Sequence, residues 1–314
     1  MSKTEIELIA SKHLGKAGDG SVVNPYITPD SVDATLLVGI PRYLNRTHYN
    51  IENTGPGSVG IDVWNAYEVS YLLSNGYPVS CFVRIVYDST SKNIVESKSI
   101  KLYLNSFNMM RVDTLDIDVS IDIVKNKIVE DLTPVLGVTP VVGVHLGYST
   151  VKQGEMAYFT QLELAIDHTA LTFDQVNEDP EILVNEDLNL LNPFDFTQIA
   201  VQTSLLRSNC RVTNQPDWGD VYIAMEAESV PTYESLAQYI VSMRKENHFH
   251  EEICECIFKR LSDKYKPKNL VVACFYTRRG GIDINPVRYT SEEYFKQFFV
   301  DFASTDVTFK TLRQ

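Results

Sequence analysis

The residues best suited to chemistry lie around Cys210, in a polar stretch from Leu206 to Asp220. A cysteine attacks as its thiolate, and an unperturbed thiol with a pKa of about 8.5 is only slightly ionised at neutral pH. A reactive cysteine therefore needs a nearby base or cation. Arg207 and Arg211 flank Cys210 and are candidates for that cation.

Asp217 can lie close to Cys210 if residues 214–216 (Asn-Gln-Pro) form a turn. A carboxylate and a thiolate side by side repel each other, so we expect the pair to share one proton and to titrate together. To donate that proton at neutral pH, Asp217 needs a pKa raised by ~3 units, and burial against Trp218 is the expected cause. The simpler interpretation is that Cys210 is one more buried residue and Asp217 caps a turn.

Four stretches of the sequence together resemble the QueF family of nitrile reductases. They are residues 96–103 (ESKSIKLY), 208–219 (SNCRVTNQPDWG), 247–252 (NHFHEE) and 276–286 (YTRRGGIDINP). They occur in the family's order, and the match runs from about residue 60 to residue 290. Members of this family reduce 7-cyano-7-deazaguanine to 7-aminomethyl-7-deazaguanine with NADPH, in queuosine biosynthesis. The two-module arrangement resembles the long, bimodular branch of the family.

The resemblance implies a role for each matching site residue. Cys210 would attack the nitrile carbon and Asp217 would protonate the nitrogen, giving a covalent thioimide that NADPH reduces. The implied substrate contacts are Val95, Glu96, Ser97, Phe249, His250 and Glu251. The implied cofactor contacts are Ser97, Lys98, Arg279 and Gly280.

These residue types suit those ligands. Buried carboxylates such as Glu251 and Glu96 can accept hydrogen bonds from the N–H groups of a guanine-like edge, and such a site rejects ligands that leave them unpaired. Arg279 beside Gly280 can grip a phosphate, because the glycine permits close backbone approach. The simpler interpretations are a solvated strand-end acid for Glu96 and a surface salt bridge for each cation, Lys98 included.

Metal chemistry is a weaker alternative. His250 and Cys254 would lie one turn apart on a helix, and both residue types ligate zinc. The sequence lacks an H-E-x-x-H motif there, so no metal site is predicted, and Cys254 fits the apolar core face of the helix. Two other functions stay open: a metal-dependent cyclohydrolase or synthase of the same fold, and a non-catalytic purine-binding protein.

Composition limits the class of protein. The chain has 314 residues and a net charge of −13, which disfavours direct nucleic-acid binding because such proteins carry a basic surface. Five scattered cysteines without an export signal indicate reduced thiols and a cytoplasmic protein. No apolar run is long enough to span a membrane, and the resemblance implies a homodimer.

Periodicity predicts an α+β protein with antiparallel sheet. The resemblance implies two tandem tunnelling-fold modules, antiparallel sheets with helices packed on one face. We expect an N-terminal extension (1–60), a first module (61–166), an acidic linker or insertion (167–196) and a second module (197–314).

Several elements can be predicted more closely. Strands 61–74 and 79–88 are expected to form a hairpin. A helix capped by Asp118 or Ser120 should end near Leu132, before Pro134. Residues 138–166 have a strand-like pattern. In the second half we expect a strand at 221–227, helices at 231–245 and 249–265, a strand at 270–276, and a turn at 279–281.

Overall fold

The computed structural model describes residues 29–53, 55, 57–185 and 197–314. These residues form two units. The first contains the described residues up to Leu44, residues 64–151 and residues 279–282; the second contains residues 45–63, 152–278 and 283–314. Within the described ranges, the structure has no helix that is both apolar and long enough to cross a bilayer.

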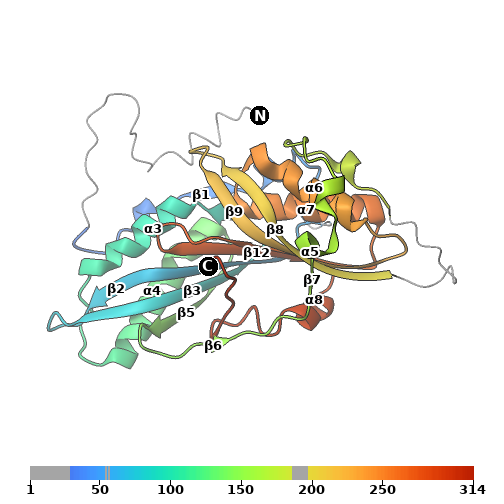
Figure 1. The fold of residues 1–314 in the computed structure, drawn as a ribbon. Helices are drawn as coiled ribbons and strands as arrows, with labels where there is room; N and C mark the ends of the chain where they lie inside the picture. Colours follow the sequence, from blue (N-terminus) through green and yellow to red (C-terminus); the bar gives the residue numbers. More distant parts are fainter. Residues whose placement is uncertain (1–28, 54, 56, 186–196) are drawn as a thin grey trace. The chain divides into compact units, whose positions relative to one another are not determined.

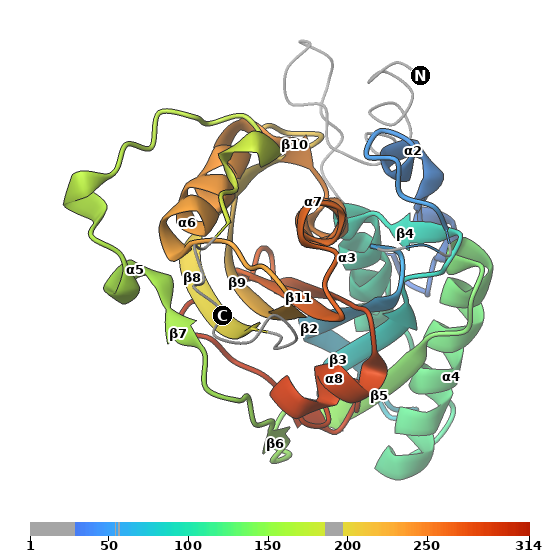
Figure 2. The ribbon, with the colours of Figure 1, turned by 90° about the vertical axis from the view of Figure 1, so that its right-hand side faces the viewer.

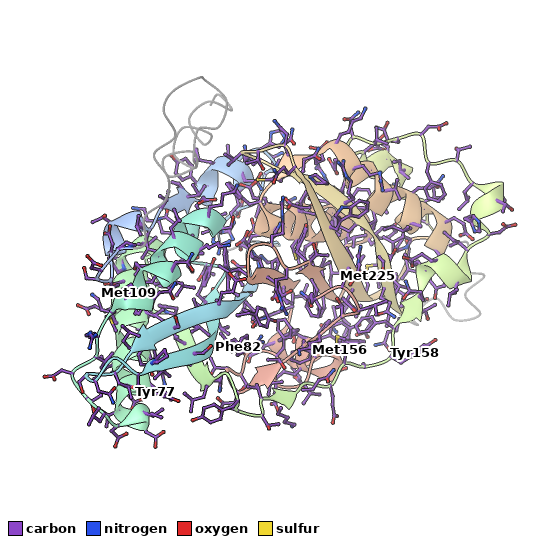
Figure 3. The ribbon with its side chains drawn as sticks, turned by 60° about the vertical axis from the view of Figure 1, so that its left-hand side comes forward. Tyr77, Phe82, Met109, Met156, Tyr158 and Met225 are labelled. Carbon is purple, nitrogen blue, oxygen red and sulfur yellow. The ribbon has the colours of Figure 1, made fainter. Side chains whose placement is uncertain are left out.

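The first unit is a sheet, in the order β2-β3-β5, with the helices α3 and α4 (Figure 1). Strands β3 and β5 pair antiparallel, and the predicted hairpin of β2 and β3 is confirmed. Tyr77 lies in the connection between its two arms (Figure 3). The elements of this unit are η2 (Ala34–Leu36), β1 (Gly39–Pro41), most of β2 (Gly60–Leu72), β3 (Pro78–Asp88), β4 (Asn93–Val95), α3 (Ser97–Asn105), η3 (Ser106–Met109), α4 (Ile117–Leu136) and β5 (Val141–Leu146).

Helix α4 differs from the prediction at both ends. The N-cap is Asp116, whose carboxylate accepts from the backbone N–H of Val119 at 3.1 Å. The helix also continues through Pro134 to Leu136. A proline there removes only one hydrogen bond of the last turn, and Gly137 then ends the helix in the left-handed region, at φ 76°.

The second unit is a curved sheet in the order β10-β8-β9-β11-β12, with α6 and α7 on one side (Figure 2). Its long strands pair antiparallel, whereas the short β7 and β10 pair parallel with β8. Side chains such as Leu206, Ile240 and Ile257 fill the space between sheet and helices. Met225 of β9 is buried in the same core (Figure 3).

The elements of the second unit bear out most of the predictions for this half. They are β6 (Lys152–Gln153), β7 (Thr160–Gln161), α5 (Leu162–Ala165), η4 (His168–Ala170), η5 (Pro180–Ile182), β8 (Thr197–Cys210), β9 (Pro216–Ala227), α6 (Tyr233–Ser242), η6 (Met243–Lys245), β10 (Asn247–His248), α7 (His250–Tyr265), β11 (Asn269–Tyr276), most of β12 (Ile282–Tyr289), α8 (Glu292–Phe298) and β13 (Val307–Thr308), with α2 (Tyr43–Arg46) spanning the junction near Leu44. Strand β9 starts earlier than predicted. Residues 147–166 are mostly irregular. The α+β class with antiparallel sheets is confirmed.

The acidic segment after residue 167 is not simply a solvated connector. Glu178 is largely buried, and its carboxylate accepts two hydrogen bonds from Arg260 of α7, at 3.0 and 3.1 Å. Lys245 N–H also donates to the carbonyl of Val176. The part of the segment up to residue 185 is therefore attached to the second unit, and residues 186–196 lie outside the described chain.

Candidate active site around Cys210

Cys210 ends β8 at a tight turn. Its N–H donates to the carbonyl of Gln215 at 2.8 Å, and its carbonyl accepts from Asn214 N–H at 2.9 Å. Asn214 is left-handed, at φ 54°, a conformation that asparagine tolerates better than most residues. A turn is present, but it lies at residues 211–213, before the predicted 214–216, and Pro216 already begins β9. The turn sets Asp217 opposite Ser208 across the two strands.

A β-bulge decides which face of the sheet Cys210 joins. Thr203 pairs with Val221 but Leu206 pairs with Gly219, so β8 holds one extra residue. Buried positions on β8 are odd-numbered before the bulge and even-numbered after it. Because strand side chains alternate, the extra residue turns Ser208 and Cys210 toward the face that the helices cover.

Glu163 of α5 holds this bulge. Its Oε1 accepts from the N–H of Ser204 at 2.6 Å and from the hydroxyl of Thr203 at 3.0 Å. The N–H of Leu205 donates to the same Thr203 hydroxyl at 3.1 Å. Sequence reasoning missed Glu163, because a bulge is a property of strand pairing and leaves no local motif.

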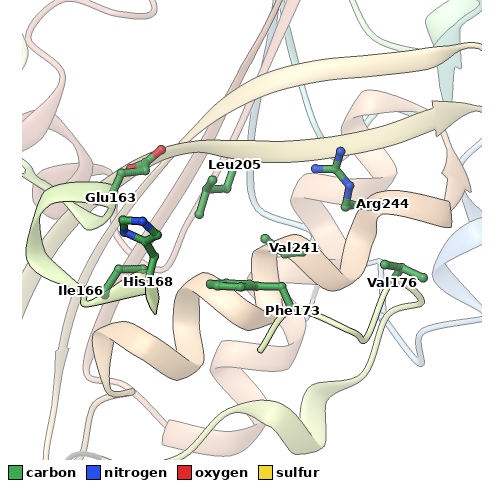
Figure 4. A pocket seen from close by; sticks show the side chains of 8 residues that line it. All are labelled: Glu163, Ile166, His168, Phe173, Val176, Leu205, Val241 and Arg244. Carbon is green, nitrogen blue, oxygen red and sulfur yellow. The ribbon is translucent and has the colours of Figure 1, made fainter. Parts of the chain in front are cut away.

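Beside the bulge lies a cavity of about 580 Å³ (Figure 4). Arg244 stands at one end and Glu163 and His168 at the other, with an apolar wall between them. None of the predicted site residues lines it. The full lining is Glu163, Ile166, His168, Phe173, Val176, Leu205, Val241 and Arg244.

The expectation that Trp218 buries Asp217 is wrong. Neighbouring residues of a strand point to opposite faces, so Trp218 and Asp217 lie on different faces of β9. The guanidinium of Arg244 lies over the Trp218 ring, 5.5 Å from its centroid. Trp218 is 38% exposed, whereas Asp217 is only 3% exposed. The burial of Asp217 therefore comes from the other face, where Ser208 and His250 lie.

His250 is the side chain that meets Asp217. Its Nε2 lies 3.5 Å from Oδ2 of Asp217, and its ring stacks on Tyr276 with centroids 3.8 Å apart. The hairpin and the first turn of α7 thus bring Cys210, Asp217 and His250 to one region of the second unit. Such an imidazole can exchange a proton with the carboxylate or orient it.

Phe249 and Glu251 lie in the same region. Phe249 is the N-cap of α7 and Glu251 stands in its first turn, and both are buried. Around them, several buried polar atoms have no hydrogen-bond partner among the described residues: Arg211 Nε, Thr213 Oγ1, Asn247 Oδ1 and His250 Nδ1. Buried polar groups are normally satisfied, so this set fits a polar ligand.

Cys210 differs from the other cysteines. It is partly exposed, while the remaining four are free and buried. Burial raises the pKa of Cys81 to about 11, and Cys254 donates to backbone carbonyls in the core. The core interpretation of Cys254 is confirmed, and no group of three or more His, Cys, Asp or Glu in the described chain is arranged to hold a metal.

The remaining predicted residues lie in the first unit. Val95 ends β4, and Glu96 is the N-cap of α3, with its carboxylate accepting from the N–H groups of Lys98 and Ser99 at 3.1 and 2.7 Å. Glu96 is only 2% exposed, so the solvated strand-end interpretation is wrong. Ser97 and Lys98 open the helix and are partly exposed.

A cationic surface follows α3 within the first unit. The turn at 279–281 brings Gly280 against Lys101, such that a Cβ on this glycine would lie 2.6 Å from Nζ. Gly280 has a positive φ of 57°, and Arg279 beside it is exposed. Lys98, one turn before Lys101, and Arg279 are suited to an anionic cofactor such as NADPH, because they can bind its phosphates.

Comparison with known proteins identifies similar chains. A family model described as the N-terminal part of a nitrile reductase, 7-cyano-7-deazaguanine reductase, matches residues 28–144, and one described as a QueF-like protein matches residues 216–294. The chain is 36% identical over 257 residues to an NADPH-dependent 7-cyano-7-deazaguanine reductase of Colwellia psychrerythraea, covering 81% of this chain and 86% of that protein. A crystal structure of the archaeosine synthase QueF-Like in the apo form aligns at 16% identity with a TM-score of 0.27, over 30% of this chain and 92% of that one.

Proposed function

The chain belongs to the family of NADPH-dependent 7-cyano-7-deazaguanine reductases, and from that premise we propose how its own residues carry out the reaction. It is an oxidoreductase that reduces the nitrile of 7-cyano-7-deazaguanine to an amine with NADPH, a step of queuosine biosynthesis. One observation carries the assignment of residues: the partly exposed cysteine, the buried Asp217 and His250 lie on the hairpin and helix end that meet in the second unit.

Cys210 acts as the nucleophile. Its sulfur adds to the nitrile carbon while the proton shared with Asp217 moves to the nitrogen, which leaves a thioimide on the enzyme. His250, 3.5 Å from Asp217, orients this carboxyl and contacts the substrate. Two molecules of NADPH, bound in turn, would each supply one hydride, one for each of the two C=N bonds that arise. After the first reduction and a protonation, the C–S bond breaks. Cys210 departs as its thiolate, and the imine that remains undergoes the second reduction.

Substrate recognition uses buried carboxylates. Glu251 accepts from the N–H groups of the deazapurine, and Phe249 covers its ring. Glu96, together with Ser97 and the backbone of Val95, makes further substrate contacts. Both glutamates are buried and match the family motifs at residues 96–103 and 247–252. A buried carboxylate discriminates strongly between ligands that donate to it and ligands that do not.

Cofactor binding uses the cationic surface of the first unit. Ser97, Lys98, Arg279 and Gly280 hold NADPH, with Arg279 gripping a phosphate and Gly280 allowing close approach. Glycine is favoured at 280 by its positive φ of 57°. We further propose that the two sheets belong to tandem tunnelling-fold modules and that the protein is a cytoplasmic homodimer; light scattering tests the dimer.

Intact-mass spectrometry tests the nucleophile. Protein mixed with 7-cyano-7-deazaguanine, without NADPH, should gain the mass of one nitrile molecule, because addition needs no reductant. Cys210→Ala should gain nothing. Cys81→Ala is the matched control and should react fully, since the thiol of Cys81 is buried with a pKa of about 11. An unmodified wild-type protein, or an adduct on Cys210→Ala, contradicts the proposal.

A further inference from the structure

Two buried ionisable residues next to the candidate site take no part in the chemistry above. His248 is the Cα partner of Cys210 where β10 pairs with β8. Its Nδ1 lies 3.2 Å from Oε2 of Glu252, and its Nε2 lies 2.8 Å from the hydroxyl of Tyr49 and 3.4 Å from Oε2 of Glu246. The imidazole therefore bridges two carboxylates.

Glu252 is the centre of this network. The same oxygen, Oε2, accepts from Nη1 of Arg211 at 2.7 Å and from the N–H of Phe249 at 3.0 Å. Arg211 directly follows Cys210, and Phe249 precedes His250. A single carboxylate thus connects the residue after the nucleophile with the helix turn that carries the proposed substrate contacts.

Among Glu246, Glu252, Arg211 and His248, the charges balance when His248 is protonated. Glu246 and Glu252 bring two negative charges, Arg211 brings one positive charge, and an imidazolium brings the second. Burial lowers the pKa of His248, but hydrogen bonds to Glu246 and Glu252 raise it more, and the net shift is upward. Burial raises the pKa of Tyr49, so that hydroxyl stays neutral.

The other titratable and charged groups that face His248 are His48, Arg260 with its partner Glu178, and the Cys210 thiol. His48 lies with its ring centroid 6.4 Å from that of His248. Arg260 covers the far side of the Tyr49 ring and is paired with Glu178. The Cys210 thiol belongs to the paired strand. Losing the imidazolium would leave an uncompensated buried negative charge, which is costly.

We propose that Glu252 and His248 are positioning residues for the reaction at Cys210. Glu252 holds Arg211, and with it the end of β8, against the first turn of α7. We call this contact of Glu252 with Arg211 the clamp, and the positive charge of His248 stabilises it. The inference rests on the proposed function, because it concerns the same sulfur. A displacement near 1 Å of a reacting group can cost ~10²-fold in rate, so the clamp matters most for the geometry of nitrile attack.

The test uses Glu252→Gln, with Asp263→Asn on the exposed end of the same helix as the control. Two rates are measured on each protein: adduct formation with the nitrile, and alkylation of Cys210 by iodoacetamide. In Glu252→Gln, adduct formation should fall ~10²-fold, while alkylation, which needs no fixed geometry, should change only a few-fold. The control should match wild type in both rates.

The pH profile separates positioning from simple stabilisation. In wild type, the rate of adduct formation should change with pH where His248 gains or loses its proton. In Glu252→Gln this change should move to lower pH, because one carboxylate partner is lost. In His248→Gln it should be absent. Imidazole NMR signals of His248 should show the same displacement without nitrile or NADPH. Equal losses in both rates, or an undisplaced His248 titration, overturn the inference. No adduct on wild type refutes the proposed function instead, and the NMR titration still tests the clamp.

Discussion

Helix α7 carries two buried carboxylates, one turn apart, that serve different networks. Glu255 accepts from Arg46 at 2.7 and 3.1 Å and from Arg288 at 2.8 Å, and Arg288 also pairs with Asp62 at 2.7 Å. Every member is nearly inaccessible to solvent, and none of the four is a histidine. Glu252 instead accepts from one arginine, a backbone amide and a histidine.

Burial therefore does not by itself distinguish a functional carboxylate from a structural one. The Glu255 network joins α7 to β2 and β12 through Asp62 and Arg288, and none of its members named above is a proposed site residue. The Glu252 network ends at the residue after Cys210 and contains a group that titrates near neutral pH. What separates the two is where each network leads and whether one of its charges can change.

The largest effect should come from the Glu255 network. Arg288→Met removes the guanidinium that pairs with both Asp62 and Glu255. Breaking a buried pair in this way typically costs about 3–5 kcal/mol in the free energy of unfolding. Urea denaturation followed by circular dichroism should show the midpoint falling with an unchanged m-value. The protein that remains folded should still form the nitrile adduct, because the network lies apart from Cys210.

If Arg288→Met lowers the free energy of unfolding by less than about 1 kcal/mol, the network contributes no more to stability than a surface salt bridge does. Loss of adduct formation at full stability would show instead that it acts on the reaction. Either outcome would remove the contrast between the two carboxylates of α7.

A third carboxylate, Glu163, tests whether positioning is confined to α7. Glu163→Ala removes the acceptor that holds the bulge of β8, so the end of the strand should lose its fixed orientation. We expect adduct formation to slow by roughly tenfold, since partial misorientation costs less than the ~10²-fold of a full displacement. Rapid mixing with the nitrile, followed by quenching and mass spectrometry, measures the rate of adduct formation.

The control for Glu163 is its neighbour Leu164, which is fully exposed on the same short helix. Leu164→Ala should keep the wild-type rate. If Glu163→Ala keeps it too, the bulge is held by strand pairing alone, and the role of Glu163 is limited to lining the cavity beside it.

Local signals in the sequence were sufficient for part of the site. Asn214 and Pro216 mark the turn after Cys210, and the start of α7 places His250 and Glu251 correctly. Non-local features were out of reach. The burial of Asp217 was assigned to Trp218, its neighbour in sequence, because the facing side chain, His250, comes from another element. The bulge held by Glu163 depends on how β8 pairs with β9.

Capping explains another error. Asp, Asn, Ser and Thr are the usual N-caps, so Glu96 was not expected to cap α3, and the same bias pointed to Asp118 or Ser120 rather than Asp116 for α4. The sequence analysis ends the helix before Pro134, whereas the helix continues to Leu136 without the hydrogen bond that a proline N–H cannot donate. Propensity therefore located α4 but not its exact ends, which depend on single hydrogen bonds, and α3 was not predicted.

The smallest effect distinguishes the two networks by pH. The folded pKa of His248 is raised above its unfolded value of about 6.5. Its contribution to stability is therefore complete below about pH 6.5 and is lost as the pH rises through the folded pKa. Urea midpoints of wild type should fall across this window, whereas those of His248→Gln should stay flat. The scan should stop before the alkaline range, where buried Cys81 adds its own dependence.

Arg288→Met gives the matching control, because it leaves His248 and its hydrogen-bond and ion-pair partners unchanged. It should be less stable than wild type at every pH and yet keep the wild-type slope. An equal slope in His248→Gln and wild type would mean that the imidazole is not charged at neutral pH. In that case Glu252 would hold Arg211 without help from His248, and the clamp would respond to pH only through its carboxylates, whose lowered pKa values confine the loss of stability to the acid range.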